Sequence, residues 1–345
     1  MGATTLHAFL ADWANAGAPR DPSRAEVAEV VRRLAEAAPA VRDAIGSGAF
    51  EGARPDAPAN AGGDLPTGLD LHADRLFRDA MRQAPVACYA SEEAREPLAL
   101  RPGARLAVAI DPLDGSSNIE IGATIGTIFS ILPAAAGDAD PAAPFRQPGR
   151  SQLAAGFFLY GPQLVLVLTV GAGTQAFRFS QRGFLRTGDA FAIPARTQEF
   201  AINASNYRHW ADPVRSYVDD CLDGAKGPRE KDFNMRWTAS LVAEAYRILV
   251  RGGVFLYPGD ARPGYRQGRL RLLYEASPIA FLIEQAGGAA TDTVAPILDL
   301  APRSLHARTP LVFGAAREVA RVARYHADPA AERSPLFGRR GLFRA

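Results

Sequence analysis

The sequence predicts an α/β protein, folded as a layered α/β/α sandwich of two subdomains. Two observations carry this prediction. Helical patterns open the chain, and short strand-like apolar runs then dominate up to about residue 179. From about residue 196, helices and strands alternate, which is typical of α/β arrangements. We therefore expect an N-terminal subdomain over residues 1–195 and a C-terminal subdomain over residues 196–335.

The first third of the chain is predicted to be mainly helical. An apolar stripe of helical spacing begins at Val27, and we expect Pro39 to kink or interrupt that helix. Residues 46–68 are rich in Gly, Pro, Ala and Asp, and they read as a long loop. A further helix is expected at residues 71–83, with Leu71 among its inward-facing residues.

The strand-like runs are short, apolar and separated by turn residues. They lie at residues 86–90, 106–110, 124–132, 153–160, 164–170 and 175–179. In the second part, helices are expected at residues 214–222 and 240–250, with a buried strand at 254–256. Another helix is expected to start at Ser277-Pro278, because proline is favoured at the first helical position.

Composition excludes several classes of protein. The net charge is only +2, and no run of clustered Lys and Arg suggests nucleic-acid binding. The two cysteines, Cys88 and Cys221, form no pattern typical of zinc sites or disulfide scaffolds. Residues 1–20 lack signal-peptide features, and no apolar run approaches the roughly 18–20 residues of a membrane span. We therefore expect a cytoplasmic protein with neither nucleic-acid nor membrane partners.

The segment Asp111-Pro-Leu-Asp-Gly-Ser-Ser-Asn118 is the sharpest chemical feature of the sequence. An apolar strand ends in two aspartates, Gly115 permits a tight turn, and two hydroxyls follow. Carboxylate oxygens suit Mg²⁺, and backbone N–H groups in a turn can hold phosphate oxygens. Taken alone, the same residues could form an ordinary Asp-rich turn.

Other residues of fitting chemistry accompany this segment. Each of them alone would more often be an ordinary surface or core-edge residue, but several carboxylates follow predicted strands, where α/β sheets bind ligands. The carboxylates are Asp64, Asp70, Glu92, Glu93 and Glu275. Residues suited to phosphate oxygens and sugar hydroxyls are Asn203, Tyr207, Arg236, Tyr257, Arg269 and Arg271.

The segment Asp111–Ile119 resembles the signature of class I fructose-1,6-bisphosphatases, and its shorter core is shared by the lithium-sensitive, Mg-dependent phosphatase superfamily. Segments at 126–129, 240–243, 252–258, 268–275 and 283–288 resemble that one family in order. The resemblance implies a sugar phosphatase fold, a homotetramer and two or three Mg²⁺ per subunit, which Mn²⁺ can replace. It implies hydrolysis of the 1-phosphate of fructose 1,6-bisphosphate by metal-activated water, in gluconeogenesis or the Calvin cycle.

The resemblance also implies roles for the residues around the metals. The metal ligands would be the carboxylates of Glu92, Asp111, Asp114 and Glu275 and the carbonyl of Leu113, with Asp64 at a third metal position. Asp70 and Glu93 would activate and orient the attacking water. The reacting phosphate would be held by Asp114, Gly115, Ser116, Ser117 and Arg271.

The second phosphate of the substrate would lie among residues of the C-terminal subdomain. The resemblance implies that these residues are Asn203, Tyr207, Trp237 and Tyr257, with Arg236 reaching in from a neighbouring subunit. Arg269 would contact both sugar and phosphate. Many family members carry Tyr where this chain has Trp237, and Lys where it has Arg269. Arg is a planar fork and Lys a point charge, so the sequence determines the preference among sugar bisphosphates less well than it determines the type of reaction.

Three other functions are compatible with parts of the pattern. The nearest is a sugar bisphosphatase that also accepts sedoheptulose 1,7-bisphosphate. An inositol-type monophosphatase shares the Asp111 segment but not those at Tyr257 and Arg269. A regulatory protein without activity would lack metal ligands, whereas every carboxylate ligand implied by the resemblance is present.

Many family members are inhibited by AMP bound among their N-terminal helices, and this chain departs from that pattern. Leu106 stands where the resemblance implies a tyrosine, and Asp21 lies near the expected phosphate position. Arg105 keeps a positive charge, and a rearranged site could use Arg20 and Arg24. We expect weak inhibition by AMP or none.

Overall fold

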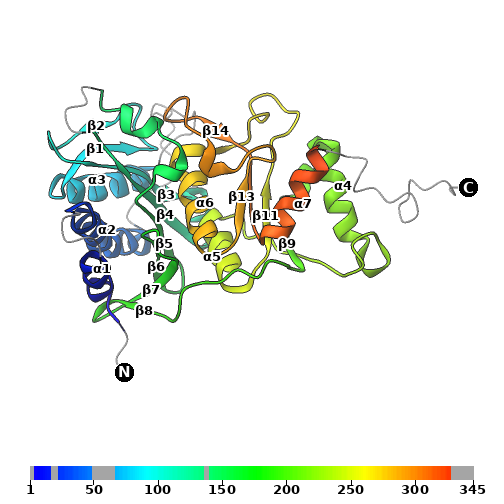
Figure 1. Ribbon diagram of the computed structural model, residues 1–345, viewed down its shortest axis with the longest axis horizontal. Helices are drawn as coiled ribbons and strands as arrows, with labels where there is room; N and C mark the ends of the chain where they lie inside the picture. The colour runs from blue at the N-terminus through cyan, green and yellow to red at the C-terminus, as the bar shows by residue number, and fades with distance from the viewer. Residues whose placement is uncertain (1–3, 17–21, 49–66, 136–139, 328–345) are drawn as a thin grey trace, which may run out of the picture.

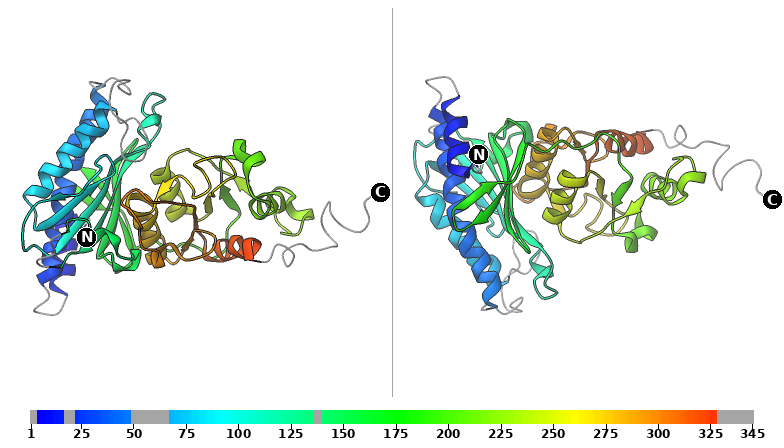
Figure 2. Two further views of the ribbon diagram at one scale, coloured as in Figure 1. Left: turned by 90° about the horizontal axis from the view of Figure 1, so that it is seen from above. Right: turned by 90° about the horizontal axis from the view of Figure 1, so that it is seen from below.

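The computed structural model describes residues 4–16, 22–48, 67–135 and 140–327. These residues form five layers, which Figures 1 and 2 show stacked along the long axis of the molecule. Three N-terminal helices cover one face of a large sheet, and two helices separate that sheet from a smaller one. Two further helices close the far side. The predicted α/β class is confirmed, and the two sandwiches share their middle helical layer.

The outer N-terminal layer contains α1 (Leu6–Asn15), α2 (Pro22–Ser47) and α3 (Gly68–Arg82). Helix α2 continues through Pro39, so the predicted interruption is wrong. Residues 49–66, most of the predicted long loop, lie outside the described residues. Leu71 is exposed, contrary to the prediction, because α3 buries the face that carries Ala73 and Phe77.

The large sheet has eight strands in the order β2-β1-β3-β4-β5-β6-β7-β8, with β1 and β3 parallel and the other neighbouring pairs antiparallel. The strands are β1 (Val86–Ser91), β2 (Leu98–Ala99), β3 (Leu106–Asp114), β4 (Ile125–Pro133), β5 (Ala154–Tyr160), β6 (Leu164–Thr169), β7 (Thr174–Ser180) and β8 (Gly183–Arg186). Strands β3, β5 and β6 are buried throughout, because helices cover both faces of the sheet. This explains their nearly continuous apolar runs.

The middle layer consists of α5 (Leu241–Arg251) and α6 (Ser277–Gln285). Val242 of α5 packs closely over Gly126 of β4, where an added Cβ atom would lie 2.8 Å from a Val242 methyl carbon. A side chain at position 126 would therefore push α5 away from the large sheet. The apolar cluster around α5 and α6 also includes Phe157 of the large sheet and Phe313 of the small one.

The smaller sheet has the order β10-β9-β11-β15-β13. Its strands are β9 (Glu199–Ala201), β10 (Asn234–Met235), β11 (Val254–Tyr257), β13 (Ala289–Thr291) and β15 (Leu311–Gly314). Helices α4 (Asp212–Leu222) and α7 (Ala316–Ala327) cover its outer face. Buried Glu318 of α7 accepts hydrogen bonds from Arg229 at 2.6 and 2.7 Å and from Tyr217 of α4 at 3.1 Å. These bonds satisfy a carboxylate that would be costly to bury alone.

Two irregular features complete the fold. A short ladder joins β12 (Leu270–Arg271) to β14 (Arg308–Thr309). Directly after β12, residues Leu272–Ala276 form a π-helical turn that leads into α6. Such wide turns are rare and are frequent at functional sites.

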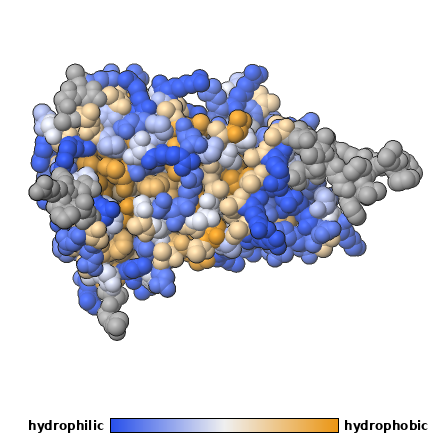
Figure 3. All heavy atoms as spheres, in the orientation of Figure 1, coloured by the Kyte–Doolittle hydropathy of each residue, from blue (hydrophilic) through white to orange (hydrophobic). Residues whose placement is uncertain are grey.

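Polar and apolar side chains are distributed unevenly over the face of the molecule in Figure 3. In Figure 3, hydrophilic side chains dominate the rim of the face shown, and apolar ones are exposed in smaller groups between them. Within the described part of the chain, no helix is long and apolar enough to span a membrane.

Candidate active site

The end of strand β3 carries the two aspartates of the Asp111 segment. In a regular strand, residues three apart face opposite sides of the sheet. The pairing of β3 with β4 is irregular between Asp111 and Asp114, so a bulge changes the direction of the second side chain. Thr127 Oγ1 donates a hydrogen bond to the Pro112 carbonyl at 2.7 Å, and the Leu113 N–H donates to Asp111 Oδ1 at 3.1 Å. These bonds hold the bulge in place.

The chain turns sharply after Asp114. Gly115 has φ = +78°, a left-handed conformation that favours glycine. The short turn of 3₁₀ helix Ser116–Asn118 follows, with Ser116 half-buried and Ser117 exposed. Two hydroxyls and the backbone N–H groups of this turn lie beside the aspartates, an arrangement suited to an anion.

Glu275 reaches the same place from the C-terminal part of the chain. The π-helical turn Leu272–Ala276 buries its carboxylate. One oxygen each of Asp111, Asp114 and Glu275 lies within 4.8 Å of the others, and no other such group of potential ligands exists in the described residues. Oδ2 of Asp114 is buried and accepts no hydrogen bond from the described residues. Three buried carboxylates with an unsatisfied oxygen fit a hard divalent cation such as Mg²⁺.

Glu92 and Arg271 adjoin the three carboxylates. Glu92 directly follows β1, and its N–H donates to the Ile110 carbonyl of the parallel strand β3 at 3.0 Å. Arg271 Nη2 lies 2.6 Å from Glu92 Oε1, and Arg271 Nη1 lies 3.9 Å from Glu275 Oε2. The Arg271 guanidinium thus partly neutralises this group of acids.

Burial and mutual repulsion change the acidity of the cluster. Burial raises the pKa of Glu275 to about 8, with Arg271 opposing the rise and Asp114 adding to it. Burial also raises the pKa of Asp114 to about 7, opposed by the backbone N–H of Val242. The pKa of Asp111 is raised well above its ordinary value by burial and by the charges of Glu92, Asp114 and Glu275. Without a bound cation, the cluster therefore holds protons near neutral pH.

Asp70 and Glu93 lie at the N-terminal side of the site. Asp70 forms a capping box with Thr67 at the start of α3, where its Oδ2 accepts the Thr67 N–H at 2.6 Å. Burial raises the pKa of Asp70, and hydrogen bonds from Thr67 and the Ser116 hydroxyl oppose the rise. The Glu93 N–H donates to Ser91 Oγ at 3.2 Å. Asp64, expected at a third metal position, lies outside the described residues.

The start of α5 joins the Asp111 segment to the C-terminal part of the molecule. Asn118 Nδ2 donates to the Ala239 carbonyl at 2.9 Å, and Ala239 has φ = +58°, an unusual value for alanine. The Ser240 side chain caps α5 by accepting the Ala243 N–H, and the backbone N–H of Val242 in the first turn of α5 bonds to Asp114. The turn after Asp114 is therefore fixed from both sides of the molecule.

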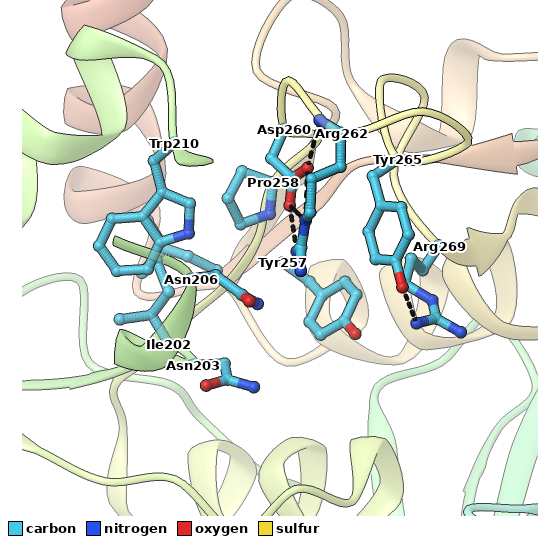
Figure 4. A pocket seen from close by; sticks show the side chains of 11 residues that line it. Ile202, Asn203, Asn206, Trp210, Tyr257, Pro258, Asp260, Arg262, Tyr265 and Arg269 are labelled. Carbon is cyan, nitrogen blue, oxygen red and sulfur yellow. Dashed lines mark hydrogen bonds and ion pairs between the residues drawn. The ribbon is translucent and has the colours of Figure 1, made fainter. Parts of the chain in front are cut away.

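A second feature is a cavity, partly open to solvent, in the C-terminal part of the chain. Asn203, Tyr257 and Arg269, three of the residues predicted to bind phosphate, line it, and Figure 4 shows their polar groups around a common space. Burial raises the pKa of Tyr257, the positive charge of Arg269 opposes the rise, and the charge of Glu275 adds to it. Since Arg269 and Arg271 are two residues apart, one extended segment of about 7 Å connects the cavity to the carboxylates.

Three other residues that were predicted to hold the second phosphate do not line the cavity. The Tyr207 hydroxyl donates to both oxygens of Asp219, at 3.0 and 3.1 Å. Trp237 stacks on Tyr257 with ring centroids 6.2 Å apart. The exposed Arg236 side chain lies 3.6 Å from Glu199.

The cavity is also lined by residues that the sequence did not predict, and half of them come from the segment after Tyr257. They are Ile202, Asn206, Trp210, Leu256, Pro258, Asp260, Arg262 and Tyr265. The segment 258–268 is rich in Gly, Pro, Asp and Arg, which is typical of a surface loop. The one feature of the sequence that could have indicated a role in the cavity is the position of this segment between Tyr257 and Arg269.

Family models cover nearly the whole described chain. The model for the N-terminal domain of fructose-1-6-bisphosphatase matches residues 20–187, and the model for its C-terminal domain matches residues 193–327. The chain belongs to the class 1 fructose-1,6-bisphosphatase family. It is 58% identical to a class 1 fructose-1,6-bisphosphatase of Rhizobium meliloti over 100% of both chains. It is 53% identical to one of Methylorubrum populi, covering 97% of this chain and 98% of the relative.

The fold agrees with solved structures of the family. A crystal structure of Leishmania major fructose-1,6-bisphosphatase in holo form is similar with a TM-score of 0.86 and 28% sequence identity. The match covers 95% of this chain and 100% of that one. The expected sugar phosphatase fold is therefore confirmed.

The raised pKa values predict an unusual dependence of stability on pH. Ordinary carboxyls ionise near pH 4, whereas folded Asp114 and Glu275 keep their protons up to about pH 7 and about pH 8. Between about pH 4 and about pH 8, the folded state binds more protons than the unfolded state. The free energy of unfolding therefore falls as pH rises through this range. With a chelator present, we expect a lower melting temperature at about pH 8 than at about pH 5.5. Mg²⁺ should stabilise the protein more at the higher pH.

Differential scanning fluorimetry at the two pH values, with chelator or Mg²⁺, checks this expectation. Asp114→Asn should reduce the pH dependence, whereas Asp189→Asn, which changes an exposed acid outside the site, should leave it as in the wild type. A chelated wild type whose melting temperature rises from about pH 5.5 to about pH 8 would contradict the electrostatic argument.

Proposed function

We propose that this chain hydrolyses the 1-phosphate of fructose 1,6-bisphosphate to fructose 6-phosphate and inorganic phosphate. One observation carries the proposal. The buried cluster of Asp111, Asp114 and Glu275 lies one short segment away from a cavity that contains Arg269. A substrate with two phosphates can place one at each end of this arrangement. The names of the full-length relatives support the same activity.

The carboxylate cluster would hold two or three Mg²⁺, with Mn²⁺ able to replace them. Asp111, Asp114, Glu275 and Glu92 would supply carboxylate oxygens, and Leu113 its carbonyl oxygen. Asp64 would serve a third metal position. When bound, the metal would polarise phosphoryl oxygens and make a water molecule more acidic.

The protein's own groups would orient the reactants. Asp70 and Glu93 would position the attacking water and accept its proton, for which the raised pKa of Asp70 is suited. The turn Gly115-Ser116-Ser117 and Asp114 would hold the reacting phosphate through backbone N–H groups and hydroxyls. Arg271, which pairs with Glu92, would turn its guanidinium towards that phosphate as metals neutralise the acids.

The second phosphate would enter the cavity. Arg269 would provide charge, and Asn203 and Tyr257 would provide neutral donors. Trp237 would support Tyr257 by stacking. Tyr207 would have to leave Asp219 to join them, and Arg236 would come from a neighbouring subunit.

The wider setting follows from the family. We propose that the protein is a cytoplasmic homotetramer without nucleic-acid or membrane partners. Each subunit would consist of an N-terminal subdomain, residues 1–195, and a C-terminal subdomain, residues 196–335. The reaction would serve gluconeogenesis or the Calvin cycle. Acceptance of sedoheptulose 1,7-bisphosphate is the alternative specificity, and an assay of phosphate release from a panel of sugar phosphates separates the two.

The proposed activity is tested by turnover of fructose 1,6-bisphosphate with and without Mg²⁺. Asp114→Asn keeps the shape of the side chain but removes a charged ligand. We expect at least a roughly 100-fold loss of kcat, because the metal supplies several kcal/mol of transition-state stabilisation. The variant should fold, as circular dichroism would verify. Near-wild-type turnover by folded Asp114→Asn protein, or wild-type activity independent of divalent cations, would refute the assignment.

Arg236→Ala tests the proposed contribution of a neighbouring subunit. Loss of a charge-assisted hydrogen bond to the unreactive phosphate, about 1.5–3 kcal/mol, should raise KM roughly 10-fold or more and change kcat little. Dissociation of the tetramer should have the same effect. Arg251→Ala is the matched control, because Arg251 also pairs with Glu199, at 3.5 Å. A variant with reduced kcat and unchanged KM contradicts the proposed role.

Weak regulation by AMP is a further expectation, and contacts among the N-terminal helices support it. Arg105 pairs with Glu26 at 2.9 Å, and Arg24 donates to the Trp13 carbonyl at 3.2 Å while stacking on its ring. Two of the three cations that could hold the nucleotide phosphate, Arg105 and Arg24, are thus engaged. Asp21 and Arg20 lie outside the described residues. Initial rates measured against AMP at subsaturating Mg²⁺ provide the check, and inhibition at micromolar AMP would show the expectation to be wrong.

A further inference from the structure

Tyr265 occupies an unusual position at the edge of the cavity. Its ring lies beside two guanidinium groups, with the Arg262 carbon Cζ 4.2 Å and the Arg269 Cζ 4.8 Å from the ring centroid. Arg269 Nη1 also donates a hydrogen bond to the Tyr265 hydroxyl at 2.8 Å. Figure 4 shows this hydroxyl next to Arg269, with the Tyr257 hydroxyl pointing towards the same pair.

The loop that carries Tyr265 is held by its own backbone. The Tyr265 carbonyl accepts the N–H groups of Asp260 at 3.1 Å and Gly268 at 3.0 Å, and the Tyr265 N–H donates to the Arg262 carbonyl at 3.1 Å. Gly268 has φ = +73°, and a Cβ atom there would lie 2.3 Å from the Thr309 carbonyl oxygen. Tyr265 is therefore positioned before any ligand arrives, which reduces the entropy cost of using it for binding.

The two arginines beside Tyr265 differ in their charge balance. Arg262 makes several hydrogen bonds to Asp260, including Nε contacts at 3.0 and 3.1 Å, so its charge is largely neutralised. Arg269 has no carboxylate partner among the described residues, and its hydrogen bond to a side chain goes to Tyr265. Arg269 thus supplies the uncompensated positive charge of this side of the cavity, and Tyr265 determines its direction.

The donors and acceptors of Arg269 and Tyr265 determine which further hydrogen bond the Tyr265 hydroxyl can make. A guanidinium has donors only, so Tyr265 must be the acceptor in its bond with Arg269. The hydroxyl hydrogen is left for another acceptor, and no described residue provides one. Next to an uncompensated cation in a cavity, the acceptor that fits is an anionic oxygen.

We propose that Tyr265 is a substrate-binding residue that donates its hydroxyl hydrogen to the non-reacting phosphate and orients Arg269 towards it. This inference rests on the proposed function and deepens it. Tyr265 would give the cavity a preference for sugars with a second phosphate. It would contribute equally to the ground state and the transition state, because that phosphate does not react.

Tyr265→Phe is the decisive variant, because it removes the hydroxyl and keeps the ring between the guanidiniums. We expect a roughly 10-fold increase in KM for fructose 1,6-bisphosphate, with kcat within about twofold of wild type. In calorimetric titrations, fructose 6-phosphate, whose phosphate should occupy the cavity, should bind roughly 10-fold more weakly. Tyr246→Phe is the matched control, since Tyr246 contacts Phe191 and does not line the cavity.

The outcomes separate this inference from the proposed function. If the wild type turns over the bisphosphate and Tyr265→Phe has the same KM and the same affinity for fructose 6-phosphate, only the inference about Tyr265 fails. An equal loss in kcat and kcat/KM would likewise overturn it. If the wild type does not turn over the bisphosphate, the proposed function fails. Titration with inorganic phosphate then still tests Tyr265, because an anion contact predicts weaker binding to Tyr265→Phe than to Tyr246→Phe.

Discussion

Repulsion among buried carboxylates is the constraint on which the rest of the structure depends. Asp111, Asp114 and Glu275 come within 4.8 Å of one another, away from water, with Arg271 as the nearby cation. Ionised carboxylates so close repel one another strongly at low dielectric, so without a cation they take up protons, and they would separate if their supports could move. The supports are a fully buried strand and a buried turn, each packed between layers. The dense core on both sides of the large sheet is thus what permits a cation site to exist.

Several groups of the site are positioned by departures from regular secondary structure. A bulge after Asp111 brings Asp114 to the same side, a left-handed glycine exposes the hydroxyls of the next turn, and a π-helical turn presents Glu275. Regular strands and helices repeat their directions every two or 3.6 residues and could not bring these groups together at such sequence spacing. The regular elements make the site rigid, and the irregular segments at their ends bring its side chains together.

The sequence was informative where patterns are local and less so where packing decides. The Asp111 segment, the strand before it and the helix after Ser240 could be predicted from apolar periodicity and turn residues. Strand β3 instead continues to Asp114, because Thr127 satisfies the Pro112 carbonyl from the neighbouring strand. Leu71 is apolar and so was expected inside, but the face of α3 that carries Ala73 and Phe77 is the one that packs against the sheet. Tyr265 was missed because its loop has turn composition and no periodicity, and only the folded loop places it beside Arg269.

The wide turn at Leu272–Ala276 has a consequence for how this chain can change over evolutionary time. A π-helical turn contains one residue more than an α-helical turn would use. Losing that residue would rotate α6 by about 100° relative to β12, turning the buried face around Ile279 and Ala280 away from both sheets. The π-helical turn Leu272–Ala276 therefore fixes the rotation of α6 relative to β12. An insertion or deletion within Leu272–Ala276 is therefore expected to disrupt the packing of α6 between the two sheets.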